Sequence, residues 1–205
     1  HKLEVQGSIG TTASSTTNSI TFTGIHRSFI NNYSLETLNN SYGLIVSANR
    51  NDYTKLNNNI CKGRNAITIS ESIPDLSITN KDSDKSVFGV ISKVENTLYR
   101  TDEYGSLVSN FEGETGDIRT FINSLGEGAI WVSNKNSLYL ESGDYITSSS
   151  IPGYGMKQSD DLMRSCTVAK ITQDIDWSSI SNTIDYTDSN NITTSYKYIL
   201  ASCTY

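Results

Sequence analysis

The amino-acid sequence predicts a mainly β domain, barrel-like or sandwich-like, built from short strands with one or two short helices. Short apolar segments recur along the chain, and clusters of Asn, Ser, Asp and Gly separate them. Ser, Thr and Asn supply 73 of the 205 residues, unlike the Ala, Glu, Lys and Leu excess of a helical bundle or coiled coil. The length corresponds to about one domain.

Eight segments carry a strand pattern. Residues 19–23 alternate apolar and polar side chains, which is the period of a half-buried strand. The other seven are apolar runs at residues 43–48, 66–70, 86–92, 128–133, 144–147, 167–172 and 196–203. The turn clusters between them lie at residues 49–52, 57–59, 80–84, 134–136 and 148–155.

Two short helices are expected, at residues 33–39 and 159–164. Asp160 and Asp161 would suit the positive end of the second helix. The chain also contains an internal echo, because residues 43–47 and 143–148 both begin with glycine, continue into an aliphatic strand and end in hydroxyl side chains. A second strand follows each of them, so two similar β-units are an alternative organisation.

Charge, cysteine and histidine content argue against several kinds of site. With 22 acidic and 16 basic residues, the net charge of -6 does not favour wrapping a nucleic-acid backbone. No apolar run approaches the roughly 18 residues of a membrane span. Cys61, Cys166 and Cys203, together with His1 and His26, show no metal-ligand spacing. We therefore expect no metal, no cofactor, no nucleic acid and no membrane span.

Residues 1–22 differ in character from the rest of the chain. Up to residue 19 this tract is made of small polar residues with few clearly apolar side chains, and it shows no helical period. Such a segment cannot build its own core, although it could gain order by packing against other copies. We expect a connector over residues 1–22 and one folded domain over residues 23–205.

An acidic group of residues is the first candidate for chemistry. It lies within residues 111–119 and 126–128, where glycines flank the acids, and consists of Glu112, Glu114, Asp117 and Glu127. Carboxylates held this close can share a proton and act as a general acid. The alternative is an acidic turn in which Arg119 balances one carboxylate.

The second candidate is residues 24–29, which hold the internal histidine, His26, beside Arg27 and Ser28. An interface or hinge switch, a self-cleavage centre and an ordinary surface pair all fit these residues. No Gly-x-Ser-x-Gly motif occurs, and the body of the domain has no second histidine. A general hydrolase or a peptidase acting on other chains therefore lacks a complete catalytic set.

The order of several motifs resembles a viral domain class. These motifs are TFTGIHRSF at 21–29, GLIVSA at 43–48, NAITISESIP at 65–74, FGVIS at 88–92, GDIR at 116–119, INSLGEGAIWV at 122–132 and SGDYITSSSIPGYGMK at 142–157. Together they are similar to the C-terminal intramolecular-chaperone domain of phage and large-DNA-virus fibre proteins. The best-known relatives are the auto-processing domains of phage pre-neck appendage proteins, which are self-cleaving peptidases. The resemblance spans residues 20 to about 177.

The resemblance implies a homotrimer that aligns three chains and lets an upstream β-rich shaft of the same chain fold. Residues 1–22 would be the end of that shaft. Alignment raises the effective concentration of the three chains and removes much of the entropic cost of nucleating an intertwined fibre. The implied location is a fibre or appendage of the virion, made in the host cytoplasm.

The phage relatives cut themselves off just before their own first strand. The same reaction here would fall near the Thr23–Gly24 bond, with His26 as general base or acid, Arg27 as charge stabiliser and Ser28 as nucleophile. A domain that trimerises without cleavage is the alternative.

The phage members also carry an aspartate and a glutamate at the cut, whereas residues 21–29 contain no carboxylate. A neighbouring strand or subunit would have to supply it, from Glu112, Glu114, Asp117 or Glu127.

A retained trimeric fibre tip that binds a host receptor or a glycan is the alternative function. Tyr139, Tyr145, Tyr154 and Trp177 could stack on sugar rings if they are exposed, or they pack in a core or interface. In the C-terminal tail, residues 196–200 could pair with a neighbouring chain as an edge strand.

Overall fold

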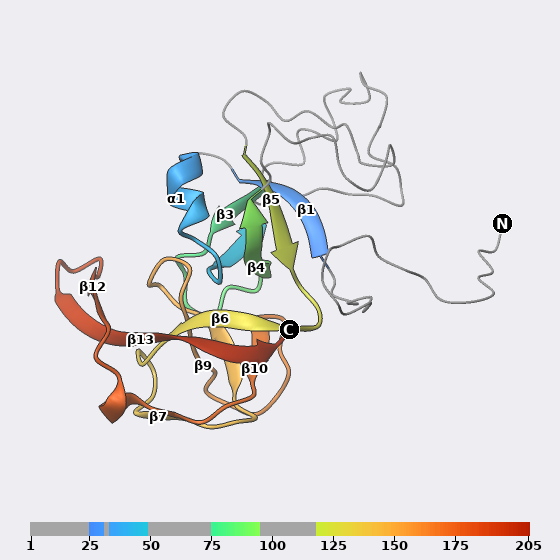
Figure 1. Cartoon of the computed structure of the whole chain (residues 1–205). Coiled ribbons are helices and arrows are strands. Elements are labelled where there is room, and N and C mark those ends of the chain that lie inside the picture. The colour runs from blue at the N-terminus through green and yellow to red at the C-terminus, as the bar shows by residue number, and fades with distance from the viewer. Residues whose placement is uncertain (1–24, 31–32, 49–74, 95–117) are drawn as a thin grey trace, which may run out of the picture.

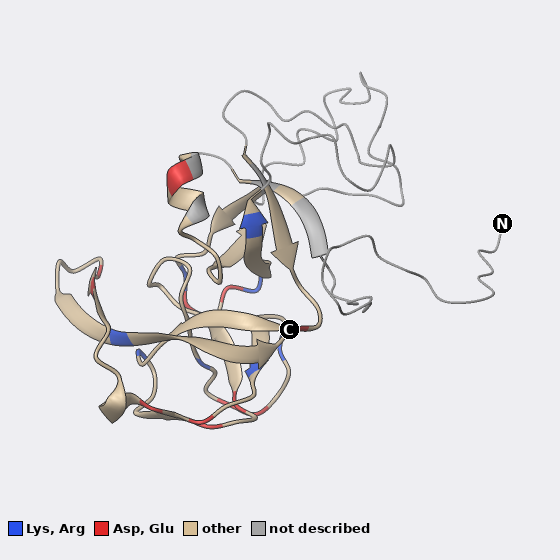
Figure 2. Cartoon of the chain, viewed as in Figure 1, with Lys and Arg blue, Asp and Glu red and all other residues tan. Residues whose placement is uncertain are grey.

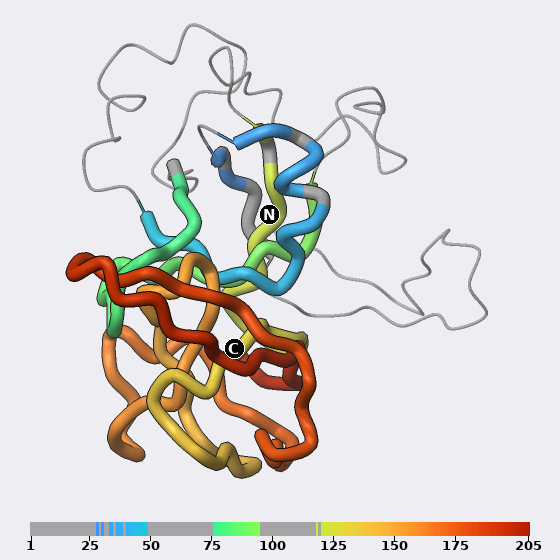
Figure 3. The backbone as a smooth tube through the Cα atoms, turned by 90° about the vertical axis from the view of Figure 1, so that its left-hand side faces the viewer, coloured from blue at the N-terminus to red at the C-terminus, as the bar shows by residue number. Residues whose placement is uncertain are grey.

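The computed structural model describes residues 25–30, 33–48, 75–94 and 118–205. Over these residues the chain is mainly β, as the sequence predicts. Figure 1 shows two stacked units, an upper one containing β1 to β5 and a lower one that begins at β6. Figure 3 shows the same two layers from the side.

The first unit is a closed five-stranded barrel in the order β1-β3-β2-β4-β5. Its strands are β1 (Ile25–Ile30), β2 (Ile45–Ala48), β3 (Asp75–Ile78), β4 (Val87–Val94) and β5 (Ile118–Asn123). β1 runs parallel to β3, and the other neighbours are antiparallel. The predicted helix at 33–39 is confirmed as α1 (Leu35–Asn39), which Ser34 caps by accepting the Thr37 N–H at 3.1 Å.

The second unit is built on β6 (Glu127–Ser133), β8 (Tyr145–Ser148), β9 (Gly155–Lys157), β10 (Thr167–Ile171) and β13 (Thr193–Thr204). These strands follow the order β10-β8-β9-β6-β13, and pairing between β10 and β13 closes the ring. β12 (Thr183–Thr187) adds to β13. β7 (Tyr139–Leu140) pairs separately with β11 (Ile175–Asp176), which leads into the 3-10 helix η3 (Trp177–Ser179).

The two units share one topology, in which β1, β2, β3, β4 and β5 correspond to β6, β8, β9, β10 and β13. In each unit the first strand is parallel to the third and antiparallel to the last. The echo in the sequence marks equivalent positions. Gly43 donates its N–H to the Ile91 carbonyl and Gly143 to the Ile171 carbonyl, both at 2.8 Å, and both glycines have positive φ. The chain therefore contains two similar β-units.

β2 and β4 contribute to two hydrophobic cores at once. Val46 and Ile91 belong to the core of the first barrel, whereas Ile45 and Val90 belong to the core of the second unit. Successive residues of a strand point to opposite faces, so both faces of β2 and β4 are covered. This explains why the two segments are nearly continuous apolar runs instead of alternating patterns.

The loop between β8 and β9 joins the two units through Gly153. Ile45 donates its N–H to the Gly153 carbonyl at 2.8 Å, and Gly153 donates to the Thr79 carbonyl at 2.7 Å. The φ of Gly153 is +78°, and a Cβ at this position would lie 2.8 Å from the Leu44 Cβ. Only glycine satisfies both conditions.

The turn before β4 makes a second connection through Asp84, which is buried. Its carboxylate accepts the Ser86 N–H at 3.0 Å and the Ser86 hydroxyl at 2.7 Å, and its own N–H donates to Ser148 Oγ at 2.9 Å. Burial raises the pKa of Asp84, but the hydrogen bonds from Ser86 and the charge of Lys81 outweigh burial, so the pKa lies below its ordinary value.

Six predicted strand segments contain observed strands, namely β2, β4, β6, β8, β10 and β13. The segments at 19–23 and 66–70 lie outside the described residues. The predicted helix at 159–164 is wrong, because this segment forms bends. Asp160 accepts the Leu162 N–H at 3.1 Å and forms an ion pair with Arg164 at 2.8 Å. The aspartate thus binds the local backbone in a turn and does not cap a helix.

The C-terminal tail also differs from expectation. The expectation that residues 196–200 form an edge strand for a neighbouring chain is not met, because each of these residues already pairs with a strand of its own subunit. Thr193 to Lys197 pair with β12, and Tyr198 to Thr204 pair with β6. Ala201 and Cys203 are buried in the second core, so the tail is an integral part of this unit.

We predict that Gly153→Ala lowers the free energy of unfolding by about 2–4 kcal/mol, because it combines an unfavourable positive φ with overpacking against Leu44. Urea unfolding measures the loss. Gly143→Ala is the matched control, since Gly143 also has positive φ (+104°) but its nearest neighbour would lie 3.9 Å away. It should lose only about 1–2 kcal/mol. Equal losses would contradict the role assigned to packing.

The lowered pKa of Asp84 predicts a dependence of stability on pH. A carboxylate whose pKa is lowered by folding stabilises the protein above its unfolded pKa, near 3.8, and this contribution disappears as the pH falls through the folded pKa. The urea midpoint of Asp84→Asn should therefore fall less between pH 5 and pH 2.5 than that of the wild type. Ser86→Ala, which removes one donor, should lie between them.

Candidate functional site

The residues predicted for self-cleavage lie along β1. Hydrogen-bonded pairing places His26 opposite Ile122, Arg27 opposite Phe121 and Ser28 opposite Thr120. β1 begins at Ile25, one residue after the expected Thr23–Gly24 bond. That bond lies outside the described residues, as do Glu112, Glu114 and Asp117. Their roles stay predictions.

Glu127 is the predicted acid that the described part of the chain includes. It is exposed and begins β6, directly after the turn at residues 124–126. Because Asn123, the last residue of β5, pairs with Ile25, this turn and the start of β1 lie at the same end of β5. The structure therefore places Glu127 at the end of the barrel where the upstream chain joins β1.

Ser28 is buried inside the barrel, with 1% of its surface exposed. Its Oγ has no hydrogen-bond partner among the described residues, whereas the Thr120 hydroxyl opposite donates to the Ser28 carbonyl at 3.3 Å. Three residues of extended strand, about 10 Å, separate Ser28 from Ile25. An attack by Ser28 on the Thr23–Gly24 bond would require the upstream chain to fold back over β1.

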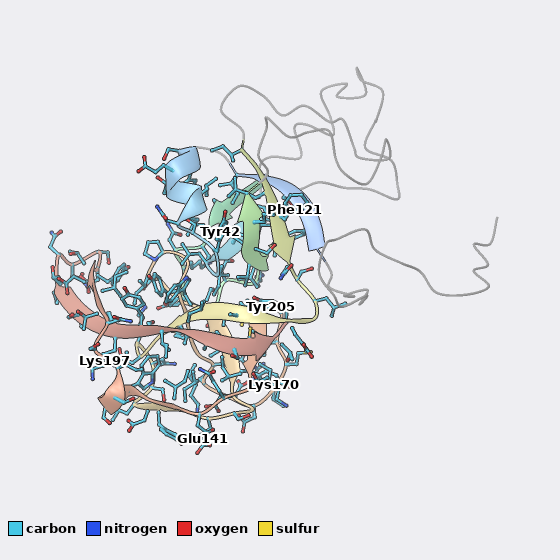
Figure 4. All side chains as sticks on the ribbon, in the orientation of Figure 1. Tyr42, Phe121, Glu141, Lys170, Lys197 and Tyr205 are labelled. Atoms are coloured by element: carbon cyan, nitrogen blue, oxygen red, sulfur yellow. The ribbon has the colours of Figure 1, made fainter. Side chains whose placement is uncertain are left out.

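A cavity of about 360 Å³ opens beside the same turn. Its wall includes Leu125 from the turn, Met163, Tyr145, Lys170 and Tyr205; Lys170 and Tyr205 are labelled in Figure 4. Leu125 and Met163 are 64% and 81% exposed, and Lys170 Nζ lies 5.8 Å from the centre of the Tyr145 ring. This surface can receive an apolar side chain, with one cation beside it.

Two titratable groups near the end of β13 are held in their uncharged forms. Burial raises the pKa of Cys203 to about 11, and burial also raises the pKa of Tyr205. The Tyr205 hydroxyl donates to the Ala129 carbonyl at 2.7 Å. Neither group is a nucleophile at neutral pH, because the reactive thiolate and phenolate forms are disfavoured.

A serine and a lysine that the sequence analysis did not single out meet in the loop after β8. Lys135 Nζ donates to the Ser150 hydroxyl and to both carboxylate oxygens of Asp82, at 2.6 and 2.7 Å. Lys135 forms an ion pair with Asp82 and donates to Ser150, so it does not accept the proton of the serine hydroxyl. The arrangement fastens the loop to the turn before β4 and does not activate Ser150.

The aromatic residues considered for sugar binding separate into different environments. Trp177 is buried at 4% exposure and belongs to the second core, so the core-packing alternative holds for this residue. Tyr139 is exposed, and Asp174, followed by burial and Glu141, raises its pKa. Tyr154 packs against Trp131 and Tyr198, with ring centroids 6.2 and 5.4 Å away. Sequence spacing gave no sign of this group, since its members come from three distant segments.

None of the helices in the described residues is long and apolar enough to cross a membrane. The described residues also contain no group of three or more His, Cys, Asp or Glu side chains placed to hold a metal ion. Comparison of the chain with protein-family models and with curated proteins found no match.

We predict that Ser28→Ala raises the free energy of unfolding by up to about 1 kcal/mol, because it removes a buried hydroxyl without a partner. Chemical denaturation measures the change. Thr120→Val is the matched control, since it removes a buried hydroxyl that does donate a hydrogen bond, and it should cost about 1 kcal/mol. A marked loss of stability in Ser28→Ala would show that the Ser28 hydroxyl has a partner.

Proposed function

We propose that this chain is the C-terminal intramolecular chaperone of a viral fibre or appendage protein. It trimerises, aligns three upstream shafts and cleaves its own chain near Thr23–Gly24. The order of the sequence motifs is the basis of the family proposal. The structural observation that supports it best is the start of β1, a strand paired along its whole length immediately after the expected bond.

The pairing of β1 with β5 fixes the strand that follows the proposed cleavage bond. Six consecutive residues of β1 lie opposite β5 in one antiparallel register, so the position and direction of the strand that follows the expected bond are fixed. His26 and Arg27 belong to this strand, and Glu127 begins β6 at the same end. In the proposal, a water molecule attacks the Thr23 carbonyl carbon, and His26 takes a proton from the water and passes it to the Gly24 amine as the C–N bond breaks. Arg27 stabilises the developing negative charge, and Glu127 supplies the carboxylate that residues 21–29 lack.

The proposed chaperone role is explained by the conformational entropy that the shaft chains lose when they assemble. Three long shafts that must intertwine lose much conformational entropy before they form stabilising contacts. A trimeric domain at one end converts the search into an intramolecular one with a high effective concentration. Removal of the domain afterwards separates the folded shaft from the domain that aligned its chains. The shaft then persists because its own unfolding is slow, which is kinetic stability.

A retained tip that binds a receptor or glycan is the second candidate function. The aromatic group of Trp131, Tyr154 and Tyr198 favours it, because Tyr42 and Leu200 beside it are 43% and 44% exposed. The Trp131 indole donates to the Tyr42 carbonyl at 2.7 Å, which fixes the ring at the surface. Rigid aromatic surfaces of this kind are typical of binding sites. A glycan array without hits on the assembled protein would remove this candidate.

Intact mass under native and denaturing conditions tests the chaperone proposal on this domain with its natural upstream sequence. We expect a native trimer whose denatured chains are split near Thr23–Gly24. A trimer of uncut chains would reduce the proposal to trimerisation and favour the retained tip. A monomer would overturn it.

Substitution of the proposed groups tests their roles. His26→Ala should slow cleavage by about 10²–10⁴-fold and Glu127→Gln by a smaller factor, with the trimer intact in both, because each removes a group used only in the chemical step. The rate is measured as the uncut fraction over time. Lys85→Ala, an exposed residue in the turn before β4, is the control and should cleave like the wild type. Unchanged rates in His26→Ala would contradict the assignment.

A further inference from the structure

A hairpin extends from the second unit, and we call it the arm (residues 183–197). It consists of β12 and the first five residues of β13. β6 pairs only with Tyr198 to Thr204 of β13, so residues 193–197 pass beyond the closed ring and pair with β12 alone. Figure 1 shows the arm at the margin of the molecule, and Lys197, labelled in Figure 4, lies at its base.

The arm is held firmly at both ends. At its base, Asn134 donates its N–H to the Lys197 carbonyl at 3.0 Å, and Lys197 donates its N–H to Asn134 Oδ1 at 2.9 Å. At its tip, Asp188 Oδ1 accepts the N–H groups of Asn190 and Ile192 at 2.8 and 2.9 Å. A strand pair fixed in this way presents its edges without a further ordering cost.

Both edges of the arm are open. Asp188 N–H donates to the Ile192 carbonyl and Tyr198 N–H to the Asn182 carbonyl, so even-numbered residues of the two strands bond to each other. In an antiparallel pair the alternate residues point their N–H and C=O groups outward. These groups have no partner among the described residues at positions 183, 185 and 187 of β12 and at positions 193 and 195 of β13.

Open edges are usually protected by proline, lysine or covering segments, because they accept strands from other chains. Residues 183–187 and 193–196 contain neither proline nor lysine, and Asp185 is their single charged residue. The arm therefore has the properties of a surface that binds another β-strand.

We propose that the arm binds the arm of a second copy of this chain, head to tail, so that the β12 edge of one copy pairs with the β13 edge of the next. This inference rests on the proposed trimer. Each copy offers both edges, and antiparallel pairing between them repeats the geometry already present inside the hairpin. Contacts between two different surfaces of one protein close into a ring when the rotation between successive copies closes, and form open filaments otherwise. A rotation of about 120° per copy gives the three-membered ring of the proposed trimer.

Charge favours this arrangement over two-fold pairing of the β12 edges. Full overlap of β12 with β12 of a second copy would place two Asp185 residues directly opposite each other, which is destabilising. Head-to-tail pairing sets Asp185 opposite neutral Thr193 or Ser195 of the next copy. Figure 2 shows acidic residues in the loops at the end of the second unit that faces away from the first barrel, and also in the arm itself. In the arm, Asp188 lies at the tip, where its carboxylate accepts backbone N–H groups, and Asp185 is the acidic residue of the paired strands.

Hydrogen exchange of the full chain, resolved to single residues, tests the pairing without any substitution. In the assembled protein, the amides at positions 183, 185, 187, 193 and 195 should exchange about ten-fold or more slowly than after dissociation by dilution. The amides of Ile184 and Tyr186, bonded inside the hairpin, should be slow in both states. If the odd-numbered amides exchange rapidly within an assembled trimer, the pairing between arms is wrong, but the proposed trimer is not contradicted.

A proline on the outer edge provides the second test. Asp185→Pro removes an N–H that donates to none of the described residues, at an edge position where strands tolerate proline. The fold should persist, judged by circular dichroism, while the assembly weakens about ten-fold or more in analytical ultracentrifugation. Ser181→Pro is the control, because it follows Ile180 in an extended conformation (ψ 129°) outside both strands.

The outcomes separate the two proposals. Weakened assembly in Asp185→Pro but not in Ser181→Pro supports pairing between arms. A trimer that both prolines leave unchanged overturns the pairing and keeps the chaperone proposal. A wild-type chain that stays monomeric at micromolar concentration overturns both.

Discussion

The arrangement of the two described units depends on the burial of β2 on both of its faces. Val46 fills the first barrel, and Ile45, the residue before it, fills the second unit. Two adjacent side chains of one strand thus hold two cores together, and the hydrophobic effect that stabilises each unit also fixes their contact. The Gly153 carbonyl accepts the Ile45 N–H at this boundary, so the interface is satisfied by backbone hydrogen bonds as well as by apolar packing.

The shared topology of the two units shows which residues a common fold requires. Gly43 and Gly143 keep a positive φ and the same hydrogen bond to the fourth strand of their unit, whereas most other corresponding residues differ. A barrel of this kind tolerates many apolar side chains provided that volume and alternation are kept. A position with positive φ, in contrast, strongly favours glycine, because residues with a Cβ avoid this conformation. The glycine is therefore the part of the repeat that can be recognised in both halves of the sequence.

Apolar runs in the sequence predicted the central strands well, and the failures have physical causes. β9 is not predicted because its three residues are too few to show the two-residue alternation of a strand. β5 is not predicted because it directly follows the acidic stretch at residues 112–117, whose charges indicate a candidate site and not the approach to a strand. The helix expected at 159–164 fails because Asp160 bonds to the backbone and to Arg164. Within the candidate site, His26, Arg27 and Ser28 could be proposed together because they are neighbours in the sequence. The burial of Ser28 and the position of Glu127 depend on strand register, which local patterns do not encode.

Closure of each unit connects the fold with the proposed function. The first barrel closes when β1 pairs with β5, and the second when β13 pairs with β6 and β10. Both closures join segments distant in sequence, which makes them slow steps that other contacts must precede. β1, the strand next to the proposed cleavage bond, is held in place only when this pairing has formed and the first barrel is complete. A folding aid built in this way would align its upstream segments after its own fold is secure, which is the order that a chaperone at the end of a fibre requires.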